Sequence, residues 1–171
     1  MATREKSNKK TSVSKTMLMP QEEMLEVKSK SEKMKIGIPS DYSKVEYRVP
    51  LTPQAVDLLT SYGHEIYIEK NAGKLASYTD EDYRKAGAVI MEKKEEVFQC
   101  DIILRVAPIS SDEIDLLRGN QTVISNMQIQ AHCSESIKKL MQKKVTTIAF
   151  ENIENEEGFL PIVHQMSQIA G

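Results

Sequence analysis

Residues 101–126 read DIILRVAPISSDEIDLLRGNQTVISN, in which two apolar runs flank one amphipathic run. The first run, Asp101–Val106, is apolar on both faces, as expected for a central strand of a parallel sheet. Ser110–Glu113 has the form of a capping box, with serine and glutamate three residues apart, and it predicts the start of a helix. The second apolar run, Thr122–Asn126, predicts the next strand. A strand, a helix and a strand joined by short connections indicate a parallel sheet.

The same alternation of strands and helices extends to both sides of this unit. Further strands are expected at 35–39, 64–69, 89–91 and 145–150, and further helices near Thr52, Thr79, Glu95, Glu135 and Pro161. Strands that alternate with helices through short connections indicate a parallel sheet with helices on both faces. Right-handed crossovers should make this sheet doubly wound. We therefore predict an α/β fold: a doubly wound, mainly parallel sheet with helices on both faces. In such sheets, ligands bind at the carboxyl ends of the strands.

The first 33 residues differ in composition from the remainder. They carry eight basic and five acidic residues and contain no Phe, Tyr, Trp or Gly, whereas residues 34–171 carry 15 basic and 20 acidic residues. So few apolar side chains cannot offset the entropy of ordering a segment that does not dock. We expect 1–33 to be an extended N-terminal tail, either mobile or docking through a short helix that begins near Pro20. Residues 34–171 form the predicted domain.

Composition argues against several classes of protein. The formal net charge of −2 is unlike that of a nucleic-acid-binding protein. No apolar stretch approaches the roughly 20 residues of a membrane span. The two cysteines, Cys100 and Cys133, form neither a disulfide framework nor a metal-ligand spacing, so we expect idle thiols in a reducing cytoplasm and no metal site. No Gly-x-Gly-x-x-Gly occurs, so the usual cradle for a dinucleotide pyrophosphate is missing.

Several motifs in register resemble those of one family. They include Met34-Lys-Ile-Gly-Ile-Pro39, Glu46-Tyr-Arg-Val-Pro-Leu-Thr-Pro53, Glu69-Lys-Asn-Ala-Gly73, Val145-Thr-Thr-Ile-Ala-Phe-Glu151 and Met166-Ser-Gln-Ile-Ala-Gly171. Together they resemble the N-terminal, substrate-side domain of the alanine dehydrogenase and proton-translocating transhydrogenase α-subunit family, over roughly 34–171. The resemblance implies a Rossmann-like or flavodoxin-like domain that holds a 2-oxo acid. It also implies an NAD-dependent oxidoreductase that converts L-alanine and water to pyruvate and ammonium.

The resemblance further implies partners for this domain. NAD would be bound in the complete protein but not by this chain alone. The expected partners are a small 2-oxo or 2-amino acid, the nucleotide-binding domain of the same protein and other copies in a cytoplasmic homo-oligomer, with no nucleic acid and no membrane span. We therefore expect the chain to be a shortened piece, a fragment or a truncated gene product that is inactive alone. Two alternatives stay open: a transhydrogenase α-subunit N-terminal domain, or a non-catalytic small-acid-binding or assembly domain.

Four residues match positions that have roles in this family. Arg48 stands at the position of the arginine that binds the substrate carboxylate, and a guanidinium offers a planar fork suited to that group. Met166 matches a methionine over the substrate, and Ser167 matches a serine near the nucleotide, although both also fit packing and surface positions of a final helix. Glu151 matches an acid for which we expect a structural role.

Two positions depart from the family pattern. The family strand reads Lys-Val-Lys-Glu-Pro, whereas this chain reads Arg105-Val-Ala-Pro108, so Ala107 replaces the lysine that polarises the substrate carbonyl. Gln128 stands at the catalytic-histidine position, and an amide cannot shuttle a proton near pH 7. His132 is an alternative base if the loop is rearranged. Arg105 is a further candidate for substrate binding, where it would supply positive charge to the cleft in place of the missing lysine. The alternative is a strand-end arginine paired with a helix acid, and the sequence leaves both open.

Overall fold

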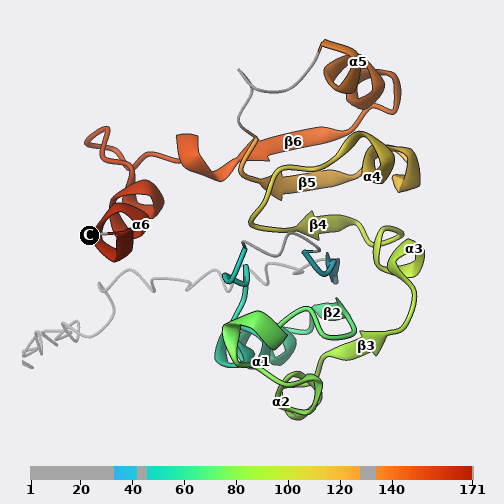
Figure 1. Ribbon diagram of the computed structural model, residues 1–171, viewed down its shortest axis with the longest axis vertical. Coiled ribbons are helices and arrows are strands. Elements are labelled where there is room, and N and C mark those ends of the chain that lie inside the picture. Colours follow the sequence, from blue (N-terminus) through green and yellow to red (C-terminus); the bar gives the residue numbers. More distant parts are fainter. Residues whose placement is uncertain (1–32, 42–45, 128–133, 171) are drawn as a thin grey trace, which may run out of the picture. The chain divides into compact units, whose positions relative to one another are not determined.

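The computed structural model describes residues 33–41, 46–127 and 134–170. Its strands are β1 (Lys35–Ile38), β2 (Glu65–Glu69), β3 (Val89–Met91), β4 (Ile102–Leu104), β5 (Thr122–Ser125) and β6 (Thr146–Ala149). Its helices are α1 (Pro53–Ser61), α2 (Asp80–Lys85), α3 (Lys94–Val97), α4 (Ser111–Leu116), α5 (Ser134–Gln142) and α6 (Pro161–Ala170), with 3-10 turns η2 (Lys74–Ala76) and η3 (Phe150–Asn152) (Figure 1). All the strands and helices expected within residues 34–171 are present, whereas the sequence did not predict the two 3-10 turns. Residues 1–32 of the predicted N-terminal tail, with the helix expected near Pro20, lie outside the described residues.

The six strands form one parallel sheet in the order β3-β2-β1-β4-β5-β6. The chain builds outward from β1 to β3, then returns to place β4 against the other side of β1 and continues to β6. This order confirms the doubly wound α/β fold. Strand order reverses between β1 and β4, and ligands of such sheets bind beyond the carboxyl ends of the strands at this switch point.

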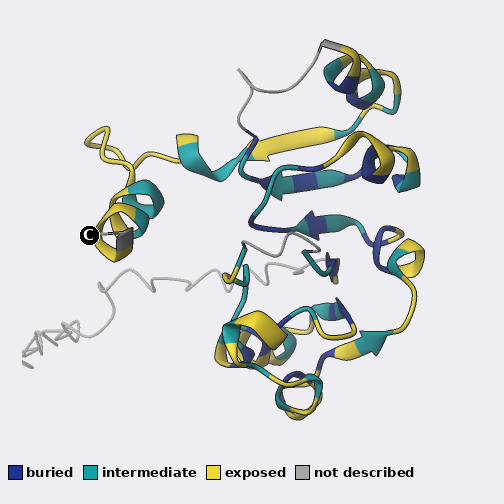
Figure 2. Cartoon of the chain, in the orientation of Figure 1, coloured by how far each residue is buried: buried dark blue, intermediate teal, exposed yellow. Residues whose placement is uncertain are grey.

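Two apolar cores cover the two faces of the sheet. In β2, Ile66 and Ile68 pack with α1 and α2, whereas Tyr67, which points to the opposite face, packs against the core formed with α3, α4 and α5. Ile103 of β4 belongs to that second core. Ile102 and Leu104 pack against the first core, so burial on both faces explains why β4 is apolar at each of its three positions. Figure 2 shows the contrast with the edge strand β6, most of which is exposed.

The helix starts predicted from the sequence have the expected capping geometry. The Thr52 side chain accepts the hydrogen bond that caps α1. Thr79 and Asp82 form a reciprocal capping box at α2, and Ser110 and Glu113 form another at α4. The second box places the Glu113 carboxylate beside the loop that follows β4, and this carboxylate has a further role described below.

Gly37, in the middle of β1, permits a close approach between the sheet and the end of α3. A Cβ at this position would lie 2.5 Å from the Val97 carbonyl oxygen and 3.1 Å from the Cys100 Cβ. Because a backbone oxygen cannot move aside cheaply, we expect Gly37→Ala to lower the free energy of unfolding by about 1–3 kcal/mol. Denaturant titration followed by circular dichroism measures this loss. Gln54→Ala, on an exposed position of α1, is the control, and equal stability of the two variants would contradict the prediction.

Candidate functional site

The loop that follows β1 carries Arg48 and is anchored near both ends. At its start, the Ser40 N–H donates to the Glu69 carboxylate at 2.8 Å. Near its end, the Tyr83 hydroxyl donates to the Leu51 carbonyl oxygen at 2.9 Å. Burial raises the pKa of Tyr83 to about 12, so its hydroxyl remains a donor at neutral pH. These bonds hold the loop at the switch point.

A pocket of about 450 Å³ opens at this switch point. It is lined by Arg48, Val49, Pro50, Leu51, Leu104, Arg105, Val106, Ile124, Phe150, Ile153, Ile162 and Met166. These residues come from the loop after β1, the ends of β4 and β5, the η3 region and α6. The pocket therefore brings together Arg48, Arg105 and Met166, three of the residues proposed from the sequence. The two arginines line the pocket together with mainly apolar residues, an arrangement suited to a small carboxylate.

Arg48 is held by a carboxylate two residues earlier in the chain. Its Nε and Nη2 atoms donate to Glu46 at 2.7 and 2.6 Å, and its backbone N–H donates to the same carboxylate at 3.0 Å. Hydrogen bonding from the Arg48 side chain holds the pKa of Glu46 below its ordinary value, so the glutamate is charged at neutral pH. The Glu46-Tyr-Arg48 motif alone does not indicate this role for Glu46, because only the folded loop shows which groups the carboxylate meets.

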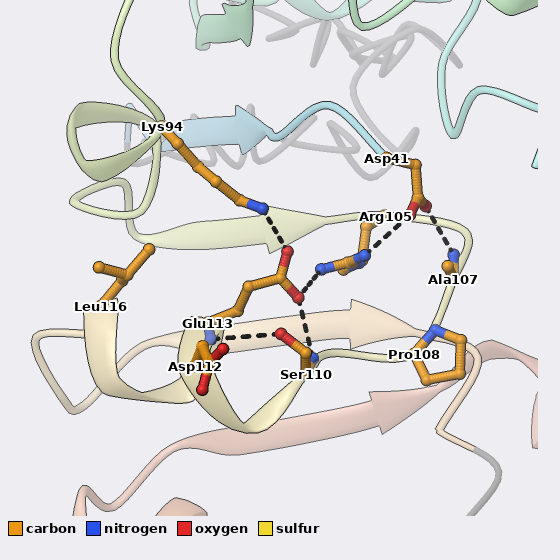
Figure 3. A pocket seen from close by; sticks show the side chains of 9 residues that line it. All are labelled: Asp41, Lys94, Arg105, Ala107, Pro108, Ser110, Asp112, Glu113 and Leu116. Carbon is orange, nitrogen blue, oxygen red and sulfur yellow. Dashed lines mark hydrogen bonds and ion pairs between the residues drawn. The ribbon is translucent and has the colours of Figure 1, made fainter. Parts of the chain in front are cut away.

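Arg105 is the centre of a buried charge network (Figure 3). The side chain is 5% exposed, and its Nη1 donates to Glu113 while its Nη2 donates to Asp41 at 3.1 Å. Lys94 of α3 donates to the other oxygen of Glu113. Arg105 thus pairs with a helix acid, one of the two arrangements that the sequence left open, and it also lines the switch-point pocket.

Glu113 remains ionised within this network. Burial alone raises its pKa, but the charge of Arg105, the hydrogen bond from Lys94 and the hydrogen bond from the Ser110 N–H outweigh burial and lower the pKa overall. The sequence identified Glu113 only as a helix cap. The same carboxylate closes the capping box and neutralises a buried arginine, and only the fold brings these groups together.

A second pocket, of about 640 Å³, lies beside the charge network. Ala107, at the position of the family lysine, lines this pocket and donates its backbone N–H to Asp41 at 3.3 Å. Its methyl side chain can neither polarise a carbonyl nor carry charge. The positive charge nearest to this position along the chain is therefore Arg105, which is already paired with two carboxylates.

The remaining residues proposed from the sequence lie elsewhere. Ser167 is exposed on α6, and its hydroxyl donates to the Val163 carbonyl oxygen of the same helix at 2.9 Å. Glu151 accepts the Met127 N–H at 2.9 Å and so links the chain after β5 to η3, an arrangement that supports the structural role expected for it. Gln128, His132 and Cys133 lie outside the described residues.

Cys100 is buried, and burial raises the pKa of its thiol to about 11, so the thiol is protonated and unreactive at neutral pH. Within the described ranges, no three His, Cys, Asp or Glu side chains gather closely enough to hold a metal ion. In the same part of the chain, no helix combines the length and apolar character needed to cross a membrane.

Comparison with protein families shows where this chain belongs. Residues 37–170 match the family described as "Alanine dehydrogenase/PNT, N-terminal domain". This chain is a member of that family. Its relatives include the alanine dehydrogenases of Bilophila wadsworthia, 33% identical over 138 residues, and of Methanococcus maripaludis, 35% identical over 139 residues. Both alignments cover 81% of this chain but only 36% and 37% of the relatives, so the chain spans just over a third of their length.

Solved structures of the family have the same fold. An L-alanine dehydrogenase matches 78% of this chain and 37% of its own with a TM-score of 0.74 and 31% identity. A transhydrogenase from Sinorhizobium meliloti matches 70% of this chain and 36% of its own with a TM-score of 0.62 and 28% identity. These likenesses confirm the family membership and the Rossmann-like α/β fold expected from the motifs.

Proposed function

We propose that this family member is the 2-oxo-acid-binding domain of an NAD-dependent, alanine dehydrogenase-like oxidoreductase. The reaction would interconvert L-alanine, water and NAD with pyruvate, ammonium and NADH. The observation that carries the proposal is the switch-point pocket. Arg48, Arg105 and Met166, which lie far apart in the sequence, line it together with mainly apolar residues. Arg48 would bind the substrate carboxylate, Arg105 would line the site as a guanidinium already paired with Asp41 and Glu113, and Met166 would pack over the substrate.

The nicotinamide cofactor does not fit the residues of this chain by themselves. The 171 residues contain no Gly-x-Gly-x-x-Gly, and the Ser167 hydroxyl is bonded to its own helix. We assign NAD to a companion nucleotide-binding domain of the complete protein. We also propose that the complete protein is a homo-oligomer in the cytoplasm. The chain's own contribution would be to hold and orient the 2-oxo or 2-amino acid.

A second candidate function is a non-catalytic small-acid-binding or assembly domain. Ala107 favours it, because the position of the carbonyl-polarising lysine holds a methyl group. Gln128, at the catalytic-histidine position, favours it too. The transhydrogenase α-subunit is the alternative within the family, and the likeness to a transhydrogenase structure supports it less strongly than the likeness to an alanine dehydrogenase.

The proposal predicts that substrate binding and turnover separate. We expect the purified 171-residue chain to bind pyruvate but to show no alanine-dependent NADH production, because hydride transfer needs a nicotinamide held against the substrate carbon. Isothermal titration with pyruvate and an absorbance assay for NADH measure the two properties. The complete protein, assayed in parallel, should show both. Turnover by the chain alone would overturn this division of roles.

A further prediction separates a slow enzyme from a non-catalytic domain. In the complete protein, Ala107→Lys combined with Gln128→His restores the family pair, and an acid–base group typically contributes 10²–10⁴-fold in rate. Because the supporting residues are not restored, we expect a smaller gain, about tenfold, in alanine turnover. The single replacements are the controls. No gain in a protein that is already as fast as ordinary alanine dehydrogenases would mean that another residue, His132 first, is the base.

A further inference from the structure

We propose that Glu46 is a positioning residue that holds Arg48 in the orientation that receives the substrate carboxylate. This inference rests on the function proposed above, in which Arg48 binds that carboxylate. The proposed function gives Glu46 no role of its own. The geometry of the Glu46–Arg48 pair carries it.

One carboxylate binds both the backbone and the side chain of the same arginine. Glu46 Oε1 accepts the Arg48 backbone N–H at 3.0 Å and Nε at 2.7 Å, while Oε2 accepts Nη2 at 2.6 Å. Three donors on one residue fix the backbone and the guanidinium relative to each other. A long arginine side chain otherwise samples many rotamers, and binding a ligand would have to restrict them.

The clamp leaves one edge of the guanidinium available. Glu46 takes the edge formed by Nε and Nη2, and no described residue accepts a hydrogen bond from Nη1. The edge formed by Nη1 and the second hydrogen of Nη2 is itself a two-donor fork that matches a carboxylate. Arg48 lines the switch-point pocket, so a small acid bound there would meet this fork.

Exposure distinguishes the two partners of the pair. The side chain of Glu46 is 13% exposed, and that of Arg48 is 48% exposed. The carboxylate is therefore the fixed, shielded half of the pair, and the guanidinium is the half open to ligand. A functional side chain supported in this way by a largely shielded partner is preorganised, which favours binding.

The test is a set of variants in the complete protein with pyruvate as the probe. We expect Glu46→Ala to raise the dissociation constant for pyruvate about tenfold and Glu46→Gln, which keeps one acceptor, about threefold. With saturating pyruvate, ammonium and NADH, kcat should change less than twofold in both variants, because Glu46 acts on binding through Arg48. Glu92→Ala, which removes an exposed partner of Lys70, is the control and should leave both constants unchanged.

A double-mutant cycle separates this inference from the proposed function. Adding Glu46→Ala to Arg48→Ala should weaken pyruvate binding no further, since the clamp has nothing left to hold. If Arg48→Ala weakens binding but both Glu46 variants bind pyruvate as well as or more tightly than the parent, the positioning role is wrong and the proposed function stands. If Arg48→Ala itself has no effect, both are wrong. Glu46→Gln, close in size to glutamate, keeps the test valid if the alanine variant fails to fold.

Discussion

Replacing Arg48 with alanine is expected to weaken pyruvate binding about 100-fold. The fork makes two charge-assisted hydrogen bonds to a carboxylate, and their combined loss is worth about 3 kcal/mol. Arg48→Lys keeps the positive charge but presents a compact ammonium in place of the planar fork, so it should recover only part of the affinity. Isothermal titration calorimetry on the complete protein, with pyruvate as ligand, measures all three dissociation constants.

Arg118→Ala provides a closely matched control for this effect. Arg118 is 47% exposed and pairs with Asp101 at 2.5 Å, much as Arg48 is 48% exposed and pairs with Glu46. Asp101 precedes β4, however, so this pair lies at the amino ends of the strands, whereas the switch-point pocket lies at their carboxyl ends. Equal loss of affinity in both variants would show a general electrostatic effect, and unchanged affinity in Arg48→Ala would remove the carboxylate-binding role.

The second large effect concerns stability. Arg105→Met should lower the free energy of unfolding by about 3–5 kcal/mol, because it leaves the buried Glu113 and the half-buried Asp41 carboxylates without their shared cation. Arg84→Met is the control: Arg84 and Glu81 form an ion pair in which both side chains are more than half exposed, so its loss should cost less than about 1 kcal/mol. Urea denaturation followed by circular dichroism compares the variants with the parent. Similar losses in the two variants would contradict the central place of Arg105.

The network also predicts how stability depends on pH. The pKa of Glu113 is lower in the folded protein than its ordinary value of 4.5, so ionised Glu113 contributes stability above about pH 4.5. That contribution is lost as the pH falls through the lower folded pKa. Glu113→Gln should therefore be less stable than the parent at pH 7, and this difference should shrink as the pH is lowered below 4.5. A difference that is constant across this range would exclude Glu113 as the titrating group.

The candidate site shows which residue roles can be assigned from the sequence and which cannot. Arg48 and Met166 were proposed from motif positions, and the structure places both at one pocket. The two roles considered for Arg105 could not be separated from the sequence, because its partners Asp41 and Glu113 lie 64 and 8 residues away along the chain. No local pattern shows which acid a buried arginine meets. The crossover that returns the chain from β3 to β4, beside β1, brings these groups together.

The sequence by itself determined the elements and the fold class of this protein. Capping residues such as Thr52 and Ser110 act within a few residues of a helix start, and Gly63, with a φ of 90°, follows the end of α1. Such residues can be recognised without knowledge of the fold. The apolar run at 101–106 signalled a strand buried on both faces. These signals are local, and they specify where helices and strands begin and end.

The tertiary structure alone decided which of these elements are neighbours and which polar groups are satisfied in the interior. Gln121, fully buried, donates to the Phe98 and Cys100 carbonyl oxygens and accepts the Arg118 N–H. In the sequence, this glutamine is indistinguishable from a surface residue. Its burial is favourable only because hydrogen-bonding partners about 20 residues away lie within reach, and partners separated this far are set by the crossing of β-α-β units rather than by any local pattern.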